Sequence, residues 1–193
     1  MKTRCYVFSA FFFSILSLAL LLSSCKKSSG GNDGSTNNSG FYLSASVNGK
    51  TWNANVANDN MQSPVLAAQT GSGASTLFLV LGIQAQGKDS SAFAIVFPQS
   101  IALNKTLVFD ASKYMIGIYA ATATAGYETS ANTNSDDSLT ITSLDQTAKV
   151  IEGTFKGTFY LTSGSGSVKV TNGKFRTPYV LDASQLPPSN IKF

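Results

Sequence analysis

The stretch Ile151–Leu161 reads IEGTFKGTFYL, and its pattern decides the fold. Its odd-numbered positions hold isoleucine, glycine, phenylalanine or leucine, whereas its even-numbered positions hold charged, hydroxyl or phenolic residues. This period of two is that of a β-strand with one buried face and one solvent-facing face. Gly153 and Gly157 lie on the buried side, where glycine lets a strand bend or admits a neighbouring aromatic ring. The stretch therefore predicts a long amphipathic strand.

The same period opens the domain at Phe41–Val47, where apolar residues alternate with a tyrosine and two serines. Asn48-Gly49 follows and supplies the left-handed dihedral angles of a tight hairpin turn. The return strand carries Trp52, Ala54 and Val56 on one face. Trp52 could form a stacking platform for a glycan, but its apolar neighbours favour a place in the core.

Further short strands follow at close spacing, and no window of this part of the chain has a helical period. Leu77–Leu81 is apolar throughout and is predicted to be covered on both faces. Ala92–Phe97 places three large side chains on one face. The remaining predicted strands are Pro64–Gln69, Leu107–Phe109, Tyr114–Ala120, Gly126–Thr129, Leu139–Leu144 and Val168–Tyr179. We predict an all-β fold, an antiparallel β-sandwich of about ten strands, with a flattened β-barrel as the alternative.

The N-terminal segment has the layout of a secretory signal. Lys2 and Arg4 precede an apolar run that ends in Leu22-Ser23-Ser24-Cys25. This ending resembles the bacterial lipobox, which implies cleavage between Ser24 and Cys25 and acylation of the Cys25 thiol with chains such as palmitate. An uncleaved transmembrane helix is the alternative, although three serines dilute the run.

The chain is predicted to comprise a signal peptide over residues 1–24, a tether over residues 25–40 and one all-β domain over residues 41–193. The tether contains no large apolar residue and is rich in Gly, Ser and Asn, which is typical of a flexible linker. Residues 25–193 number 169, the size of a single domain.

The composition excludes several classes of function. Without Lys2 and Arg4 the net charge falls from +4 to +2, and no basic cluster follows Lys26-Lys27, so the sequence does not indicate a nucleic-acid-binding protein. The chain contains no histidine, which excludes Ser-His-Asp and Cys-His mechanisms and the usual zinc sites. We expect no cofactor.

The stretch Asn132–Asp137 gathers oxygen ligands in one predicted loop. Asn134, Asp136 and Asp137 are candidate calcium ligands. The stretch lacks the spacing and the bidentate glutamate of the twelve-residue calcium loop, so a solvated turn is the simpler interpretation.

Asp137-Ser138-Leu139 resembles the short Asp-Ser/Thr-apolar motif at which Bacteroidota attach O-linked glycans to exported proteins. The resemblance implies Ser138 as a glycosylation site.

Three motifs resemble one family: VNGKTW at residues 47–52, IEGTF at residues 151–155 and VTNGKF at residues 170–175. Together with the lipobox they are similar to a family of Bacteroidota lipoproteins whose β domain has no assigned function. The resemblance spans most of residues 41–179 and implies an outer-membrane setting. It brings no catalytic residues.

The sequence therefore predicts a lipid-anchored outer-membrane lipoprotein, facing either the periplasm or the cell exterior, with a non-catalytic domain that binds a glycan or a protein. Two alternatives are open. Carboxylate pairs can support glycan hydrolysis without histidine. A purely structural role in the envelope would need no binding site at all.

Overall fold

The computed structural model describes residues 40–56, 63–71, 76–86, 89–122, 124–129 and 136–180. Within these ranges the regular structure consists of eleven β-strands and one short 3₁₀ turn, which confirms the all-β class. No helix in them is long and apolar enough to cross a membrane. The elements are β1 (Tyr42–Val47), β2 (Lys50–Asn53), β3 (Val65–Thr70), β4 (Leu77–Gln86), β5 (Asp89–Pro98), β6 (Leu107–Val108), η3 (Ala111–Lys113), β7 (Ile116–Ala120), β8 (Gly126–Thr129), β9 (Ser138–Asp145), β10 (Val150–Leu161) and β11 (Ser167–Val180).

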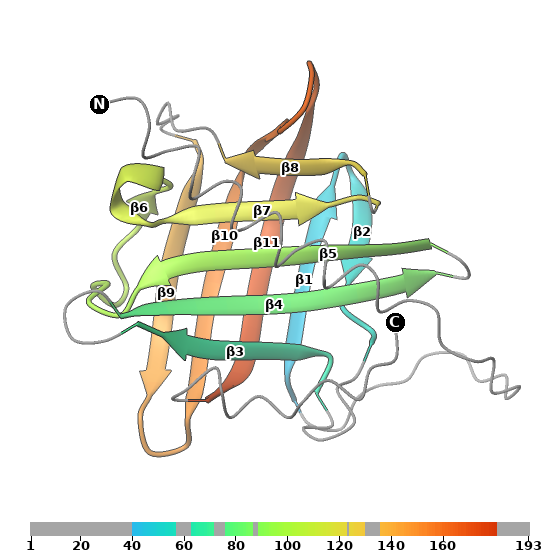
Figure 1. Ribbon diagram of the computed structural model, residues 1–193. Coiled ribbons are helices and arrows are strands. Elements are labelled where there is room, and N and C mark those ends of the chain that lie inside the picture. Colours follow the sequence, from blue (N-terminus) through green and yellow to red (C-terminus); the bar gives the residue numbers. More distant parts are fainter. Residues whose placement is uncertain are drawn as a thin grey trace, which may run out of the picture.

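The strands lie in two layers that cross at a steep angle (Figure 1). One layer contains β3, β4, β5, β7 and β8, and the other contains β2, β1, β11, β10, β9 and β6. Hydrogen bonds join the layers into a single eleven-stranded sheet, because β11 pairs with β3 and β10 pairs with β8. The core fills the space between the layers.

One pairing departs from the predicted antiparallel arrangement. Tyr179 and Val180 of β11 run parallel to Ala67 and Ala68 of β3, whereas the other strand pairs are antiparallel. These two strands are far apart in the sequence, so no hairpin sets their relative direction. The path of the chain between β3 and β11 determines their relative direction instead. Short-range sequence patterns carry no information about that path.

The strand β10, which contains the motif that decides the fold, is shared between the layers. It pairs with β9 from Val150 to Lys156 and with β8 from Phe159 to Leu161. Its register with β11 shifts between Phe155 and Gly157, and such a bulge bends a strand and increases its twist. The bend carries β10 from one layer to the other.

Aromatic rings join the two layers in the core. Phe93 of β5 is fully buried and lies 4.8 Å from the Trp52 ring and 4.7 Å from the Tyr119 ring, measured between ring centroids. The same ring lies 5.6 Å from Phe155 and 6.0 Å from Phe159, both on β10. Phe93 is therefore the centre of the interlayer packing.

Glycines opposite phenylalanines make room for these rings, which confirms the prediction for Gly153, whereas Gly157 lies at the bulge and faces Asp137. Gly153 pairs with Phe175 and Gly173 pairs with Phe155 across β10 and β11. A Cβ atom on Gly153 would lie 2.6 Å from Phe175 Cζ, and one on Gly173 would lie 2.5 Å from the Phe155 carbonyl oxygen. Both positions therefore require glycine for steric reasons.

The hairpin turn is confirmed, but the strand after it is shorter than predicted. Asn48 and Gly49 have φ angles of 49° and 80°. The return strand β2 ends at Asn53, and Val56 is 39% exposed. The backbone N–H groups of Asn55 and Val56 both donate to the Ile83 carbonyl of β4, so the chain turns toward the other layer after Asn53.

The prediction that Leu77–Leu81 is covered on both faces is wrong. Phe78 and Val80 are buried in the core, whereas the leucines of β4 face outward and are half-buried. The neighbouring strand β5 is instead the one that is buried on both faces, from Ala92 to Phe97. The inward positions of Phe93, Ile95 and Phe97 follow the predicted pattern.

Candidate binding site

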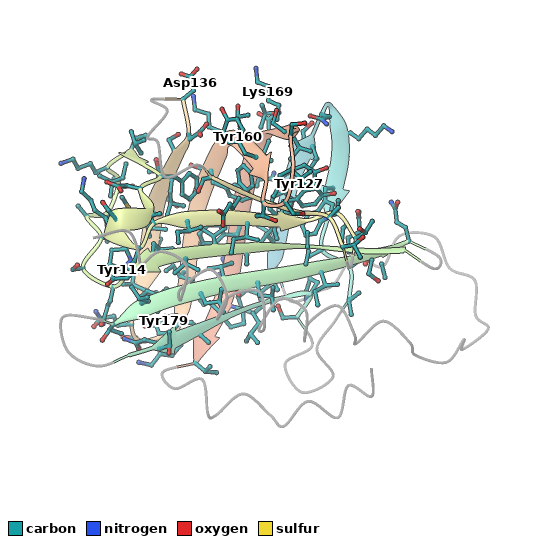
Figure 2. The ribbon with its side chains drawn as sticks, turned by 45° about the horizontal axis from the view of Figure 1, so that its top comes forward. Tyr114, Tyr127, Asp136, Tyr160, Lys169 and Tyr179 are labelled. Atoms are coloured by element: carbon teal, nitrogen blue, oxygen red, sulfur yellow. The ribbon has the colours of Figure 1, made fainter. Side chains whose placement is uncertain are left out.

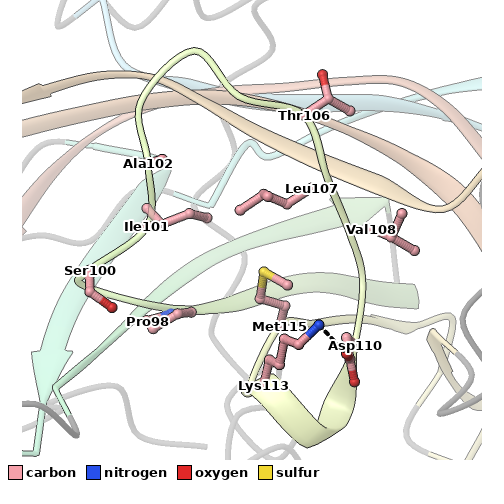
Figure 3. A pocket seen from close by; sticks show the side chains of 10 residues that line it. All are labelled: Pro98, Ser100, Ile101, Ala102, Thr106, Leu107, Val108, Asp110, Lys113 and Met115. Carbon is pink, nitrogen blue, oxygen red and sulfur yellow. Dashed lines mark ion pairs between the residues drawn. The ribbon is translucent and has the colours of Figure 1, made fainter.

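A hollow of about 610 Å³ lies where the chain connects β5 to β7. The connection passes through β6 and η3, and its side chains line most of the space (Figure 3). The lining residues are Pro98, Ser100, Ile101, Ala102, Thr106, Leu107, Val108, Asp110, Lys113 and Met115.

The hollow has apolar walls and a charged rim. The side chains of Ile101 and Leu107 point toward one another from the two sides of the loop, and Met115 lies below them (Figure 3). At the rim, Lys113 Nζ lies 3.0 Å from Asp110 Oδ2, and the lysine is largely exposed. An apolar cavity with a few fixed polar groups is the usual form of a binding site.

Hydrogen bonds hold the wall of the hollow in one shape. The Asp110 N–H donates to the Met115 carbonyl (2.9 Å), and the Met115 N–H donates to the Asp110 carbonyl (3.0 Å). Asp110 Oδ1 also accepts from the N–H and the hydroxyl of Ser112. These bonds from Ser112, with that from Lys113, lower the pKa of the Asp110 carboxyl below its usual value. The site is therefore pre-formed.

Two residues of the connection adopt backbone conformations that favour glycine. Asn104 has φ 56° and Tyr114 has φ 58°. The Asn104 N–H donates to the Ile141 carbonyl of β9 (2.8 Å), which ties the loop to the sheet. Tyr114 is the C-cap of η3, and its N–H donates to the Ala111 carbonyl (3.2 Å).

Two large apolar side chains of the same connection are exposed. Leu103 and Tyr114 each expose 47% of their surface. Leu103 follows the lining residue Ala102, and Tyr114 lies between the lining residues Lys113 and Met115. Exposed apolar side chains beside an apolar hollow are typical of a protein-interaction site.

Trp52 is a core residue, and the possible role as a glycan-stacking platform is wrong. The side chain is 3% exposed, its Nε1–H donates to Ser91 Oγ (2.7 Å), and its ring packs edge-on against Phe93. A ring enclosed between two sheet layers has no face on which a sugar could stack.

Of the calcium candidates, Asp137 is buried and serves the sheet. It is 2% exposed, and its Oδ1 accepts a 2.7 Å hydrogen bond from the Thr158 N–H. β10 pairs with β9 only as far as Lys156 and with β8 only from Phe159 onward. Thr158 lies between these two stretches, so the Asp137 carboxylate accepts the hydrogen bond that a neighbouring strand would otherwise accept. Asp136 is exposed and Asn134 lies outside the described residues. No group of three or more acidic or cysteine side chains that could hold a metal occurs in the described part of the chain.

Substitutions at Asp137 should separate its hydrogen bond from its charge. Burial raises the pKa of the Asp137 carboxyl above the ordinary 3.8, against the lowering effect of the Thr158 hydrogen bond. Because this pKa is higher in the folded chain than in the unfolded chain, the carboxyl stabilises the fold most at pH values below the unfolded pKa, where it is protonated. This stabilisation is lost as the pH rises through the folded pKa. Asp137→Asn keeps the acceptor without a buried charge, so we expect it to be at least as stable as the natural chain at about pH 7.

The comparison is made by denaturant unfolding at several pH values. The advantage of Asp137→Asn should shrink as pH falls toward the unfolded pKa. Asp137→Ala should lose about 1–3 kcal/mol because the Thr158 N–H is left without a partner. An alanine variant as stable as the asparagine variant would contradict this role.

Ser138 is also buried, at 7% exposure, between Asp137 and the fully buried Leu139. Its backbone pairs with Val108 on one side and Lys156 on the other. In the folded domain the hydroxyl is therefore not accessible to a glycosylating enzyme, and the motif serves as the start of β9.

The other carboxylates with a described partner take part in local structure. Asp145 Oδ1 accepts from the N–H groups of Thr147 and Ala148 in the turn before β10, and Glu152 forms a 2.9 Å ion pair with Arg176. With Asp110 and Asp137, these groups hold turns and strands together. Asp59 and Asp182 lie outside the described residues.

The predicted cleavage and lipidation site at Ser24 and Cys25, and the tether up to residue 39, lie outside the described residues. No family model, curated protein or solved structure matches this chain. The resemblance of the three motifs to Bacteroidota lipoproteins therefore stays a prediction.

The sequence did not point to the hollow. Its walls come from Pro98, Ile101, Leu107 and Met115, which are ordinary apolar residues without a motif. The spacing gave no signal either, because the predicted strand Leu107–Phe109 divides this connection into short loops.

Proposed function

We propose that this chain is a lipid-anchored envelope protein whose β domain binds a partner protein at the hollow between β5 and β7, without catalysing a reaction. The observation that carries the proposal is the pre-formed apolar hollow with Leu103 and Tyr114 exposed beside it. Burial of an apolar anchor side chain in such a pocket typically dominates the binding energy of a protein interface.

The chemistry of the hollow supports a protein as the ligand in preference to a glycan. Glycan recognition would call for an aromatic face inside the site, and none of the residues that line the hollow is aromatic. The walls of the hollow are instead aliphatic and sulfur-containing, and the Asp110–Lys113 ion pair supplies a polar rim. This pattern of apolar centre and polar rim is that of a protein interface.

A photo-crosslinker placed beside the hollow should capture the partner in living cells. We expect Tyr114→p-benzoylphenylalanine to give one discrete adduct on irradiation, identified by mass spectrometry. Tyr160→p-benzoylphenylalanine is the matched control, because Tyr160 is similarly exposed (41%) but belongs to β10. It should not give this adduct.

A second pair of variants tests whether the hollow itself is needed. Ser100→Trp puts a large side chain into the hollow and should reduce the adduct by about tenfold or more. Gln99→Trp, at the exposed neighbour that does not line the hollow, should leave it unchanged. Equal adducts at Tyr114 and Tyr160, or an adduct insensitive to Ser100→Trp, would contradict the proposal.

A further inference from the structure

Four cations that are separate in the sequence come together on one face of the sheet. Lys156 lies on β10, and Lys169, Lys174 and Arg176 lie on β11. The register pairs Lys169 with Thr158, Lys174 with Thr154 and Arg176 with Glu152, so these side chains share the outward face of the β10–β11 pair. We call it the cationic face.

The cationic face carries a net positive charge. On β10 and β11 the only carboxylate is that of Glu152, which pairs with Arg176 at 2.9 Å. The three lysines are exposed. Exposed carboxylates on neighbouring segments belong to Asp136, which lies two residues before the Lys156 partner Ser138, and to Glu128, which pairs with Tyr160. Hydroxyl groups of Thr154 and Thr158 fill the positions between the lysines.

Aromatic rings support two of the cations. Lys174 Nζ lies 5.6 Å from the centroid of the Tyr42 ring, which is 39% exposed, and the Arg176 guanidinium lies 5.2 Å from that of Phe41. Tyr160, also exposed, lies near Lys169 at one end of the fold, away from Tyr114 and Tyr179 (Figure 2). Amphipathic aromatics beside lysine and arginine are favoured at a membrane–water interface.

The chain enters the domain at this same face. Arg176 Nη1–H donates to the carbonyl of Gly40, the first described residue, and β1 begins at Tyr42 opposite Arg176. A flexible tether of the length predicted between Cys25 and Gly40 has a root-mean-square span of about 20 Å. The lipid anchor would therefore hold the cationic face within reach of the bilayer surface.

We propose that the cationic face rests on the anionic lipid headgroups of the membrane that holds the anchor. The inference rests on the proposed lipid anchor. The charge of the face is complementary to headgroup phosphates, and a lysine near an anionic membrane surface gains about 1 kcal/mol, or roughly a fivefold preference. Lys26-Lys27, directly after Cys25, would add to the same attraction.

The experiment measures how close this face lies to the lipid. The mature lipidated chain, checked by intact mass, is reconstituted in vesicles and carries a fluorophore on Thr154→Cys or on Gln99→Cys. Quenching by headgroup-labelled lipid is compared between vesicles that contain phosphatidylglycerol and vesicles of phosphatidylcholine alone. We expect strong quenching at Thr154 only in the anionic vesicles, and weak quenching at Gln99 in both.

Two matched charge variants identify the cause. The triple variant Lys156→Gln, Lys169→Gln, Lys174→Gln should lower quenching at Thr154 by about threefold or more. The triple variant Lys50→Gln, Lys105→Gln, Lys149→Gln removes the same charge elsewhere and should leave it unchanged.

Other outcomes would overturn the inference. A lipidated chain quenched equally at both positions, or equally in both vesicles, would overturn the membrane contact and leave the anchor intact. A mature chain without acyl groups would overturn both. If the protein binds a soluble polyanion through the cationic face and the quenching does not depend on the lipid, the ligand of this face is a polyanion and not the membrane.

Discussion

Phe93→Ala is expected to lower the free energy of unfolding by about 3–5 kcal/mol. The Phe93 ring is fully buried and contacts Trp52, Tyr119, Phe155 and Phe159, so its removal leaves a cavity between the two layers. The cost combines lost transfer free energy with unfilled space, because rings held by strands on both sides can relax only partly.

Guanidinium unfolding of the mature chain in detergent measures the effect. Phe41→Ala is the matched control, since Phe41 is only half-buried just before β1, and we expect it to cost under about 1 kcal/mol. Equal destabilisation by the two substitutions would contradict the placement of Phe93 at the centre of the core.

The second large effect concerns the anchor. Cys25→Ala is expected to reduce the amount of the protein in the outer-membrane fraction by about tenfold or more, because each buried methylene of an acyl chain contributes about 0.8 kcal/mol to membrane binding. The thiol that would receive the lipid is then missing, and the peptidase that acts on the lipidated precursor has no substrate.

The chain supplies its own control. Its other cysteine, Cys5, lies in the predicted signal segment, so Cys5→Ala should leave the outer-membrane amount unchanged. Immunoblots of separated inner and outer membranes measure both variants. An outer-membrane amount that Cys25→Ala does not change would remove the lipid anchor from the account.

The local features of the fold were predictable because they depend on neighbouring residues. The alternation in Ile151–Leu161 indicated β10, Asn48-Gly49 indicated the first hairpin, and the spacing of Phe93, Ile95 and Phe97 indicated an inward face. Each of these is a statement about side-chain period or turn geometry, which a short window contains.

Long-range features were not predictable in the same way. The parallel contact of β11 with β3 and the division of β10 between β9 and β8 join residues that are distant in the sequence. The outward leucines of β4 illustrate a related limit. A continuous apolar run predicts a strand that is buried on both faces. Which strand of a layer is buried in this way depends on the whole fold.

The candidate sites show the same division. Trp52 could be assigned to the core from its neighbours, whereas the hollow needed the loop at Asn104 to fold back on β9. The lysines of the cationic face are separate in the sequence. Only the pairing of β10 with β11 brings Lys156, Lys169 and Lys174 together.

The intact mass of the natural protein tests the central claim most directly, because both proposals depend on a domain tethered by lipid. We predict a chain that begins at Cys25 and carries two or three acyl groups on that residue. A natural chain that retains Met1–Ser24, or one that begins elsewhere with an unmodified Cys25, would contradict the account.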